Sequence, residues 1–394
     1  MGQSGNHCDV EAMREGARRR LPRFAFDFID GGALRENALD RNRSALDAVR
    51  LAPRVLAGAE QRDTTLCLFG ETFAAPFGIA PIGMAGLIAP GIDLALARAA
   101  ADAGIPYALS TAGTADIETI AQAAPPSWFQ LYVGRDAEIV DDLIRRADAA
   151  GCPVLIVTAD VPAPGKRLRD IRNRFSLPLR PDLRMAFDVA THPGWAWRIA
   201  TGGAPRFANL ERYATPGASV QSLAELMAAQ SSARLDWDLL ARIRERWRRP
   251  LILKGVLRPD DAVRAIAAGV DGIAVSNHGG RQLDAAPAPI EALPAIRDAV
   301  GPAVPLIVDG GARNGEDIAR ARVLGADLVL FGRAFLYGAA ALGLRDGPQA
   351  VIALLRDELD RAMTQLGCAT LPALDRSLLF RRYGSAEFSG DIPA

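Results

Sequence analysis

The stretch that decides the fold is residues 304–333, which read VPLIVDGGARNGEDIARARVLGADLVLFGR. An apolar run over 306–310 ends in glycines, a helical pattern follows over 316–324, and a Leu-Gly-Ala turn leads into a second apolar run over 328–332. Both runs are continuously hydrophobic rather than alternating, which is typical of parallel strands buried on both faces. The stretch therefore predicts a strand, a helix and a second parallel strand.

The same pattern repeats along the chain from about residue 76. The helical patterns between the runs include 93–103, 138–149, 236–247 and 260–268. Eight strands that alternate with helices predict an α/β fold of the TIM (β/α)₈ barrel type. A doubly wound sheet is the alternative, but its Gly-x-Gly-x-x-Gly phosphate turn follows none of the runs. The eight predicted strands are 77–81, 107–110, 128–133, 154–160, 251–255, 272–277, 306–310 and 328–332.

The remaining segments fit around this barrel. We expect a single domain over residues 1–394, with an N-terminal helical cap at 1–75 that opens with a helix from Asp9 to about Arg20. The barrel would occupy 76–340, and a C-terminal helix and tail 341–394. The connection after strand 4 is far longer than a normal βα loop, so residues 161–235 are predicted to form a lid or binding surface with an irregular middle at 191–198.

Composition limits the classes of function. Lys+Arg and Asp+Glu number 46 each, so no net charge favours a nucleic-acid partner. The four cysteines form no Cys-x-x-Cys pair, which disfavours a disulfide framework or a zinc site and favours a reducing compartment. The N-terminus has no apolar signal segment, and no apolar run is long enough to span a bilayer. We expect a cytoplasmic protein without a bound metal, with attachment to the inner membrane surface left open.

In a TIM barrel the active site lies where the strands end, and the loops after strands 7 and 8 commonly bind phosphate. Here those loops read Asp309-Gly310-Gly311-Ala312-Arg313 and Gly332-Arg333. Glycines let backbone N–H groups approach an anion, and arginines add charge-assisted hydrogen bonds. The two loops together predict a phosphate site.

Polar residues end three other strands. His278, one of three histidines, ends strand 6, and Asp160 ends strand 4. An imidazole beside a carboxylate can accept a proton and be stabilised as imidazolium. Arg281 follows His278 closely and could bind a substrate carboxylate with two hydrogen bonds. Lys254 follows an apolar run directly, so we expect its ammonium at the floor of the site, stabilising negative charge on a cofactor or intermediate.

The segment 276–284, SNHGGRQLD, resembles the active-site motif of the FMN-dependent L-2-hydroxy acid oxidases and dehydrogenases. The resemblance runs from about Leu21 to the C-terminal helix and includes WFQLYV at 128–133, LKG at 253–255 and DGG at 309–311. Within that family the chain looks most like the mandelate and L-lactate dehydrogenases. The resemblance implies an FMN enzyme that oxidises an L-2-hydroxy acid to the 2-keto acid, and a homotetramer.

The resemblance also implies roles for single residues. His278 would be the base, with Asp160 supporting its imidazolium, while Arg281 and Arg167 would bind the carboxylate. Tyr132 would bond the substrate hydroxyl, and Lys254 would face the N1–C2=O edge of the flavin. The residues implied to contact the flavin ring are Pro81, Ile82, Gly83, Ser110, Gln130, Thr158, Lys254 and Ser276. Those implied to bind the ribityl phosphate are Asp309, Gly310, Gly311, Arg313, Gly332 and Arg333.

The chain departs from the family pattern at two positions. Phe28 stands where members commonly have a tyrosine whose hydroxyl helps to bind the substrate carboxylate, so the arginines would bind it alone. Ala112 or a neighbour replaces the tryptophan of glycolate oxidase. The resemblance therefore implies a roomier pocket that favours aromatic or longer side chains over glycolate.

Two further features bear on the electron acceptor. Gly83 stands where oxidases of the family tend to have alanine, which favours a dehydrogenase that passes electrons to a quinone or another carrier, with oxygen as the alternative. Trp195, Trp197 and Arg198 lie in a mixed apolar and basic stretch of the insertion. They could rest on a membrane surface near a quinone or form a lid over the site, and both interpretations stay open.

Three rival hypotheses involve other functions. An FMN enzyme similar to IMP dehydrogenase would need a nucleophilic cysteine at a barrel loop, and none of the four cysteines lies at the end of a strand. A flavin-binding protein without turnover would predict damage at His278, Asp160, Arg281 or Lys254, and all four are present. An enzyme that modifies a peptide-derived 2-hydroxy or amino substrate remains an alternative, because the long insertion could accommodate one.

Overall fold

The computed structural model describes residues 7–134, 136–175, 182–213 and 235–380. Its centre is an eight-stranded parallel sheet in the order β3-β10-β9-β8-β7-β6-β5-β4. The two end strands meet through one parallel bridge between Ile79 and Tyr107, so the barrel is nearly closed. The predicted (β/α)₈ barrel is confirmed. The strands are β3 (Phe77–Ile79), β4 (Ala108–Ser110), β5 (Trp128–Tyr132), β6 (Leu155–Thr158), β7 (Leu251–Val256), β8 (Gly272–Val275), β9 (Leu306–Asp309) and β10 (Leu328–Phe331).

The parallel register brings the polar strand ends to one rim. Ser110 pairs with Gln130, Thr158 pairs with Lys254, and Asp309 pairs with an apolar residue of β10. The preceding residues of the strands are buried and apolar because both faces of a parallel sheet are covered. Polar residues at or near the ends of β4, β5, β6, β7 and β9 therefore come together at this rim.

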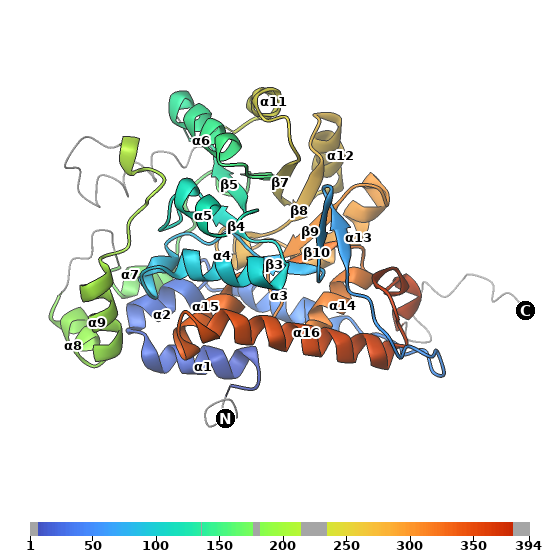
Figure 1. Cartoon of the computed structure of the whole chain (residues 1–394), viewed down its shortest axis with the longest axis horizontal. Helices are drawn as coiled ribbons and strands as arrows, with labels where there is room; N and C mark the ends of the chain where they lie inside the picture. Colours follow the sequence, from blue (N-terminus) through green and yellow to red (C-terminus); the bar gives the residue numbers. More distant parts are fainter. Residues whose placement is uncertain (1–6, 135, 176–181, 214–234, 381–394) are drawn as a thin grey trace, which may run out of the picture.

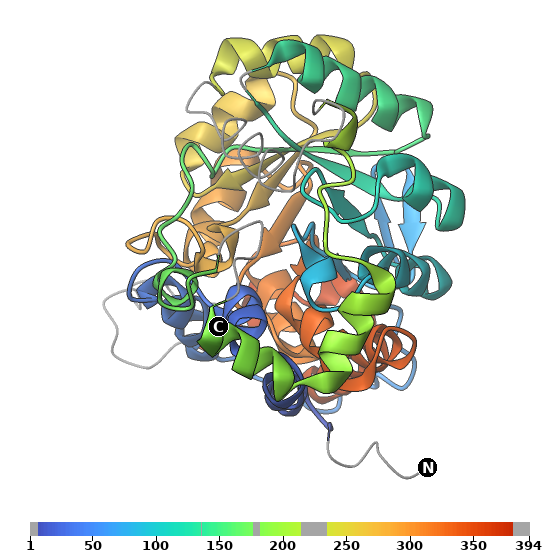
Figure 2. The same cartoon turned by 90° about the vertical axis from the view of Figure 1, so that its left-hand side faces the viewer.

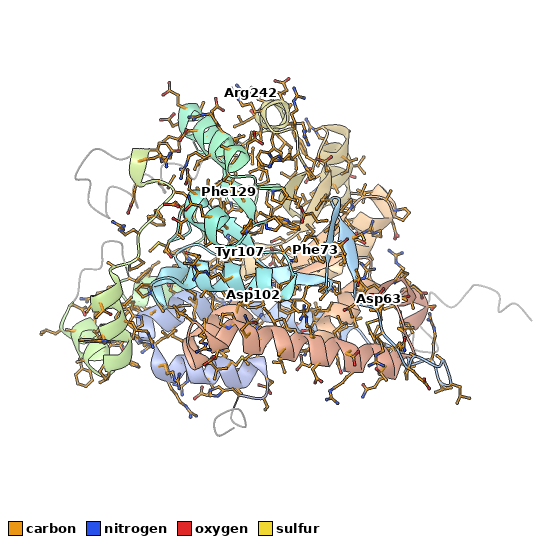
Figure 3. The ribbon with its side chains drawn as sticks, viewed as in Figure 1. Asp63, Phe73, Asp102, Tyr107, Phe129 and Arg242 are labelled. Carbon is orange, nitrogen blue, oxygen red and sulfur yellow. The ribbon has the colours of Figure 1, made fainter. Side chains whose placement is uncertain are left out.

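Helices surround the barrel on its outside (Figure 1). Several begin at an acidic or amide side chain that accepts a backbone hydrogen bond, including Asp116, Asp136, Asp236 and Asn314. In Figure 3 the buried Phe129 and Tyr107 lie among the strands, whereas the exposed Arg242 lies at the outer edge of the molecule. The helices that follow strands are α4 (Ile92–Ala103), α5 (Ile117–Ala123), α6 (Ala137–Ala149), α11 (Trp237–Arg246), α12 (Pro259–Ala267), α13 (Pro289–Val300), α14 (Gly315–Val323) and α15 (Arg333–Leu342).

The N-terminal segment contains α1 (Val10–Arg20), α2 (Arg23–Asp30) and α3 (Asn37–Ala48), then a hairpin of β1 (Leu66–Leu68) and β2 (Glu71–Phe73). The helix predicted from Asp9 is present, and the Asp9 side chain accepts from the Ala12 N–H at 2.6 Å. Figure 1 shows α1, α15 and the long α16 (Asp346–Leu366) side by side along one edge, and α1 contacts α15. The hairpin was not foreseen, and the predicted domain limits stay a prediction.

The insertion after β6 is more helical than the sequence suggested. It holds α7 (Leu168–Arg172), α8 (Leu183–Ala190), α9 (Pro193–Gly202) and a short 3₁₀ turn, η3 (Glu211–Tyr213). The irregular middle predicted for 191–198 is wrong, because α9 begins there with Pro193 in its first turn, where a fixed φ favours the helix. Figure 2 shows α8 and α9 beside the N-terminal helices. The other parts of the insertion, 176–181 and 214–234, and the predicted tail at 381–394 lie outside the described residues.

The remaining short elements are 3₁₀ turns. Two of them, η2 (Ala85–Leu87) and η4 (His278–Gly280), follow β3 and β8 at the polar rim. The other two, η5 (Leu371–Ala373) and η6 (Arg376–Leu378), follow α16. The turns after β3 and β8 thus belong to the end of the barrel where the active site was expected.

Candidate active site

A cavity of about 580 Å³ opens where the polar strand ends meet. Three of the predicted residues, Ser110, Asp160 and Ser276, do not line it directly and lie behind its wall. In the described part of the chain, no three His, Cys, Asp or Glu side chains gather closely enough to hold a metal ion. The predicted site residues that do line the cavity are Phe28, Pro81, Ile82, Gly83, Gln130, Tyr132, Thr158, Arg167, Lys254, His278, Arg281, Asp309, Gly310, Gly311, Arg313, Gly332 and Arg333.

His278 and Asp160 meet as the sequence predicted. The Nδ1 atom of His278 lies 2.9 Å from a carboxylate oxygen of Asp160. With Nδ1 facing the carboxylate, Nε2 is left on the other side of the ring, 3.4 Å from the hydroxyl of Tyr132. A carboxylate on one ring nitrogen fixes the orientation of an imidazole and stabilises its protonated form. The arrangement suits His278 to proton transfer through Nε2.

Lys254 connects this pair to a second carboxylate. Its ammonium lies 3.2 Å from Asp160 and 3.6 Å from Asp309, and it donates to the hydroxyl of Ser276 at 2.9 Å. Ser276 in turn donates to Asp309 at 2.6 Å and accepts from the backbone N–H of His278 at 3.0 Å. The buried cation is therefore shared between two carboxylates, and its position at the floor of the cavity is as expected.

Burial and charge set the ionisation of this group. Burial raises the pKa of Asp160, but the charges of Lys254 and His278 outweigh it and hold that pKa below its usual range. Burial lowers the pKa of Lys254, but Asp160 and Asp309 outweigh it and raise that pKa above its ordinary value. Burial raises the pKa of Tyr132 to about 12. At neutral pH the site thus contains a carboxylate, an ammonium and a phenol that keeps its proton.

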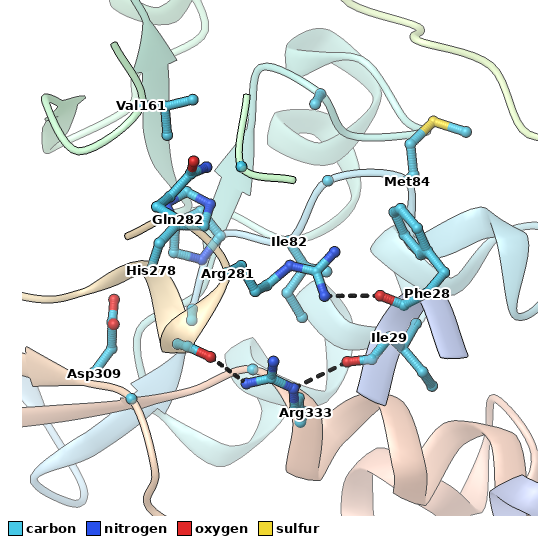
Figure 4. Close-up of a pocket in the computed structure, with 18 of the residues that line it drawn as sticks. Phe28, Ile29, Ile82, Met84, Val161, His278, Arg281, Gln282, Asp309 and Arg333 are labelled. Carbon is cyan, nitrogen blue, oxygen red and sulfur yellow. Dashed lines mark hydrogen bonds between the residues drawn. The ribbon is translucent and has the colours of Figure 1, made fainter. Parts of the chain in front are cut away.

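The other side of the cavity is rich in arginine. Arg281 donates to the backbone oxygens of Phe28 at 2.7 Å and Gly31 at 2.9 Å, and its guanidinium lies 5.2 Å from the centre of the Phe28 ring (Figure 4). The guanidinium of Arg167 lies 5.3 Å from the same ring. Burial, together with the positive charges of Arg167 and Arg333, lowers the pKa of Arg281 well below its ordinary value. Because a guanidinium stays protonated in proteins, this is a site that an anion would stabilise.

The predicted phosphate loops have a mixed outcome. Gly310 and Gly311 have φ values of 103° and 93°, which glycine adopts readily. Arg333 donates to the backbone oxygens of Ile29, Gly31 and Gly279, as Figure 4 shows in part, so its guanidinium faces the N-terminal segment. Its predicted contact with a phosphate, like that of Arg313, stays a prediction.

Two buried polar atoms on the cavity wall have no hydrogen-bond partner among the described residues. They are Nε2 of Gln130 and Oγ1 of Thr158. The carboxamide oxygen of Gln130 is fixed by the Ser110 hydroxyl at 2.7 Å, so its nitrogen faces away from Ser110. Buried polar atoms without partners are uncommon and costly, so these two indicate a polar ligand along the inner wall.

Several apolar residues of the cavity were missed by sequence reasoning. Met84 follows the predicted Gly83 directly, so its place beside a strand end could have revealed it. Phe175 and Phe207 come from the insertion and carry no local signal; the ring of Phe175 lies 5.2 Å from that of Phe28. Val161 and the polar Gln282 were missed as well, whereas Ala112, which the sequence had indicated, also lines the cavity. Figure 4 shows Met84 near Phe28.

Comparison with known proteins extends over nearly the whole chain. A family model described as FMN-dependent dehydrogenase matches residues 17–381. The L-lactate dehydrogenase of Caulobacter vibrioides is 41% identical over 372 residues, which cover 94% of this chain and 97% of that protein. The L-lactate dehydrogenase of Alcaligenes faecalis is 40% identical over 370 residues, 93% of this chain and 97% of that protein.

Two solved structures are similar at the level of the fold. One is a monotopic membrane protein, (S)-mandelate dehydrogenase, with a TM-score of 0.92 and 38% identity over 96% of this chain and all of that one. The other is a mandelate oxidase, with a TM-score of 0.80 and 37% identity over 93% of this chain and 97% of that one. The likeness therefore extends over the barrel and the N-terminal helices.

Proposed function

Because this chain belongs to the FMN-dependent dehydrogenase family, we propose how its cavity holds FMN and which hydroxy acid it accepts. Its activity is the FMN-dependent oxidation of L-2-hydroxy acids such as lactate or mandelate, and the predicted family, enzyme class and cofactor are confirmed. The alternatives of a flavin-binding protein without turnover and of a peptide-modifying enzyme find no support in these relatives.

The cavity wall fits a flavin ring. Gln130 and Thr158 present buried polar atoms that have no partner within the described ranges, and a ring with nitrogen and oxygen atoms along its edge would pair them. Lys254 would face the N1–C2=O edge with its ammonium, and Pro81, Ile82 and Gly83 would lie along the ring. Ser110 and Ser276 would act through Gln130 and Lys254, which they hydrogen-bond. The ribityl phosphate would bind Asp309, Gly310, Gly311, Arg313, Gly332 and Arg333.

Bound FMN would accept the two electrons that the substrate loses, together with one of the substrate's two departing hydrogens. The protein must take up the other hydrogen as a proton, and we assign that step to Nε2 of His278, with Asp160 stabilising the imidazolium. Tyr132, protonated because its pKa is raised to about 12, would donate to the substrate oxygen that becomes the keto oxygen. Arg281 and Arg167 would bind the carboxylate. The observation that carries this assignment is the 2.9 Å contact between His278 and Asp160 at the cavity wall.

We propose that the preferred substrate has a bulky apolar or aromatic side chain. The residues that support this are Phe28, Met84, Ala112, Phe175 and Phe207, which give the cavity an apolar region beside the arginines. Apolar pockets bind larger apolar groups more tightly, by about 0.8 kcal/mol for each buried CH₂. Ala112 is buried and lines the cavity, so a larger side chain at this position would take up part of the cavity.

The test is anaerobic mixing of the purified protein with L-mandelate, L-lactate and glycolate in turn, followed by flavin absorbance. We expect mandelate to bleach the flavin fastest and glycolate slowest. The matched variant Ala112→Trp should slow mandelate more than glycolate, because the added ring fills the apolar region. Turnover of glycolate that equals or exceeds that of mandelate would contradict the proposed preference, and no bleaching by any of the three would contradict the assigned activity.

We propose that electrons pass to a quinone or another carrier rather than to oxygen. Gly83 supports this, since it stands where oxidases of the family tend to have alanine, and a Cβ added there would lie 3.0 Å from the Cβ of Ala112. Admitting air to the substrate-reduced protein should reoxidise it slowly, and a soluble quinone should do so quickly. Faster reoxidation by air than by the quinone would make the protein an oxidase.

We propose a peripheral membrane contact at α8 and α9. No helix in the described ranges is long and apolar enough to cross a bilayer. Trp195, with 3% of its surface exposed, donates to the backbone oxygen of Leu87 and packs into the protein, so it cannot serve as a membrane contact. Trp197 is 71% exposed, and Leu183 and Phe187, on one face of α8, are 92% and 72% exposed. Exposed apolar side chains on packed helices suit insertion into a membrane surface.

The membrane proposal has its own test. The full-length protein should sediment with lipid vesicles, and a variant with Leu183→Asp, Phe187→Asp and Trp197→Ser should stay in the supernatant. That variant should oxidise the hydroxy acid with a soluble acceptor at the wild-type rate, because the three side chains are outside the cavity wall. Equal sedimentation of both proteins would contradict the contact. The homotetramer and a location at the cytoplasmic face remain proposals, to be tested by light scattering and by cell fractionation.

A further inference from the structure

The backbone of the loop that follows β8, residues 276–284, is strained at His278. His278, Gly279 and Gly280 have φ values of 58°, 61° and 76°, so three consecutive residues are left-handed. Glycine adopts this conformation readily, whereas a residue with a Cβ does so only where the surroundings hold it. This turn sets the His278 ring against Asp160. It also directs the Arg281 side chain toward Phe28, as Figure 4 shows. Contacts from neighbouring residues must therefore stabilise the left-handed conformation of His278.

The side chain of Asn277 holds the turn from within the loop. Its Oδ1 accepts from the backbone N–H of Gly280 at 3.0 Å, and its Nδ2 donates to the backbone oxygen of Pro287 at 3.1 Å. The rest of the amide is bound by Asn42, from α3, through a reciprocal pair: Asn42 Nδ2 to Asn277 Oδ1 at 2.9 Å, and Asn277 Nδ2 to Asn42 Oδ1 at 2.6 Å. Both side chains are buried. The amide of Asn277 thus makes two donated and two accepted hydrogen bonds, the full number available to it.

The helix α3 is itself fixed against the same loop. The carboxylate of Asp284 accepts from the backbone N–H of Arg35 at 3.1 Å, the side chain of Asn37 at 3.0 Å and the backbone N–H of Ala38 at 3.1 Å. A Cβ on Gly280 would lie 2.7 Å from the backbone nitrogen of Leu39, so the loop touches the helix backbone directly. These contacts between α3 and the loop therefore fix the position of Asn42 relative to Asn277.

We propose that Asn42 is a positioning residue that acts through Asn277 to keep His278 in its left-handed conformation, with its ring against Asp160. Asn42 does not line the cavity. It packs behind Gly310 and Gly311, where an added Cβ would lie 3.2 Å and 2.5 Å from Asn42 atoms, so flavin content is part of the test. The inference rests on the proposed function in one respect, which is that His278 is the base.

The test compares two substitutions on α3. Asn42→Leu keeps the side-chain volume but removes both hydrogen bonds to Asn277. Leu46→Ala, at another buried position of the same helix, removes apolar packing and leaves the amide pair intact. Both proteins are purified with FMN, and flavin content and thermal unfolding are measured first, so that loss of fold or cofactor is separated from loss of function.

We expect Asn42→Leu to lower kcat roughly 10- to 100-fold, the size of effect that a small misplacement of a catalytic group produces, and to change KM for the hydroxy acid less than threefold. Backbone hydrogen exchange over 276–284, read by mass spectrometry, should become faster, above all at the Gly280 amide. Leu46→Ala should unfold at lower temperature yet keep the wild-type kcat and the wild-type exchange over 276–284. Adding Asn42→Leu to Asn277→Leu should cause little further loss, since the first acts through the second.

An Asn42→Leu protein with wild-type kcat and wild-type exchange would overturn the proposal. So would equal losses of kcat in the two single variants, because the effect would then follow from helix packing alone. If the wild-type protein oxidises none of the hydroxy acids, the proposed function fails, and hydrogen exchange over 276–284 still decides whether Asn42 holds the loop.

Discussion

On one side of the cavity Lys254 lies between Asp160 and Asp309, whereas on the other side Arg281 lies near Arg167 and Arg333 and donates to backbone oxygens. In the first region each neighbouring charge stabilises the next, which raises the pKa of Lys254 and lowers that of Asp160. In the second region burial, together with the like charges of Arg167 and Arg333, lowers the pKa of Arg281.

This difference separates the two tasks of the site. A buried cation between two carboxylates is already stabilised before any ligand binds. In the second region Arg167 pairs with Asp170 at 3.1 Å, but among the described residues Arg281 donates only to neutral backbone oxygens, so a bound carboxylate would stabilise that region further. The first region is therefore suited to proton transfer and to supporting a cofactor, and the second to substrate binding. Substitutions in the two regions should accordingly affect different kinetic constants.

The largest effect should come from the proton-transfer region. The substitution His278→Gln removes the proposed base but leaves the arginines in place. We expect kcat to fall roughly 10³-fold, within the range for general base catalysis, with KM for the hydroxy acid nearly unchanged. Stopped-flow flavin reduction at several substrate concentrations gives both constants. A large rise in KM with an unchanged limiting rate would mean that the two regions do not divide the tasks in this way.

The next effect should come from the arginine region. The substitution Arg281→Met removes a hydrogen bond to a charged group that contributes about 1.5–3 kcal/mol, so kcat/KM should fall roughly 10- to 100-fold, mainly through KM. Arg281→Lys is the matched control, because it keeps the charge and loses the planar fork. We expect it to recover part of the loss. A change confined to kcat would place Arg281 with the proton-transfer residues instead.

A smaller effect is expected from a substitution that strengthens binding of the substrate carboxylate. Phe28→Tyr restores a hydroxyl beside Arg167 and Arg281, whose guanidinium groups lie over the ring. One added hydrogen bond to the substrate carboxylate should lower KM for lactate or mandelate roughly 10-fold. Steady-state kinetics with a soluble acceptor measures it. An unchanged KM would show that the arginines alone satisfy the carboxylate.

The smallest effect concerns stability in acid. The folded-state pKa of Asp160 lies below its usual range because of Lys254 and His278, so the unfolded chain binds more protons below about pH 4. The stabilisation that Asp160 contributes is present above pH 4 and is lost as the pH falls toward the folded-state value. Between pH 7 and pH 3 the wild type should lose on the order of 1 kcal/mol more than Asp160→Asn. Urea unfolding at both pH values tests this, and equal losses would contradict it.

Local patterns in the sequence were enough for the barrel and for one region of the cavity. Continuous apolar runs predicted the eight strands, and parallel strands must end at a common rim, so His278, Asp160 and Lys254 could be placed together before the structure was known. The sequence also indicated that Lys254 is buried, because it follows an apolar run directly.

Other features were decided only by the tertiary structure. The sequence could not predict that Arg281 and Arg333 donate to carbonyl oxygens of the N-terminal segment, or that Phe175 and Phe207 line the cavity. The amide pair of Asn42 and Asn277 joins residues 235 positions apart. Contacts of this kind leave no periodic or local signal, because they depend on how separate elements pack and on which buried polar groups remain to be satisfied. The sequence by itself determined which residues end the strands, and packing of the N-terminal helices and the insertion determined how those residues are held.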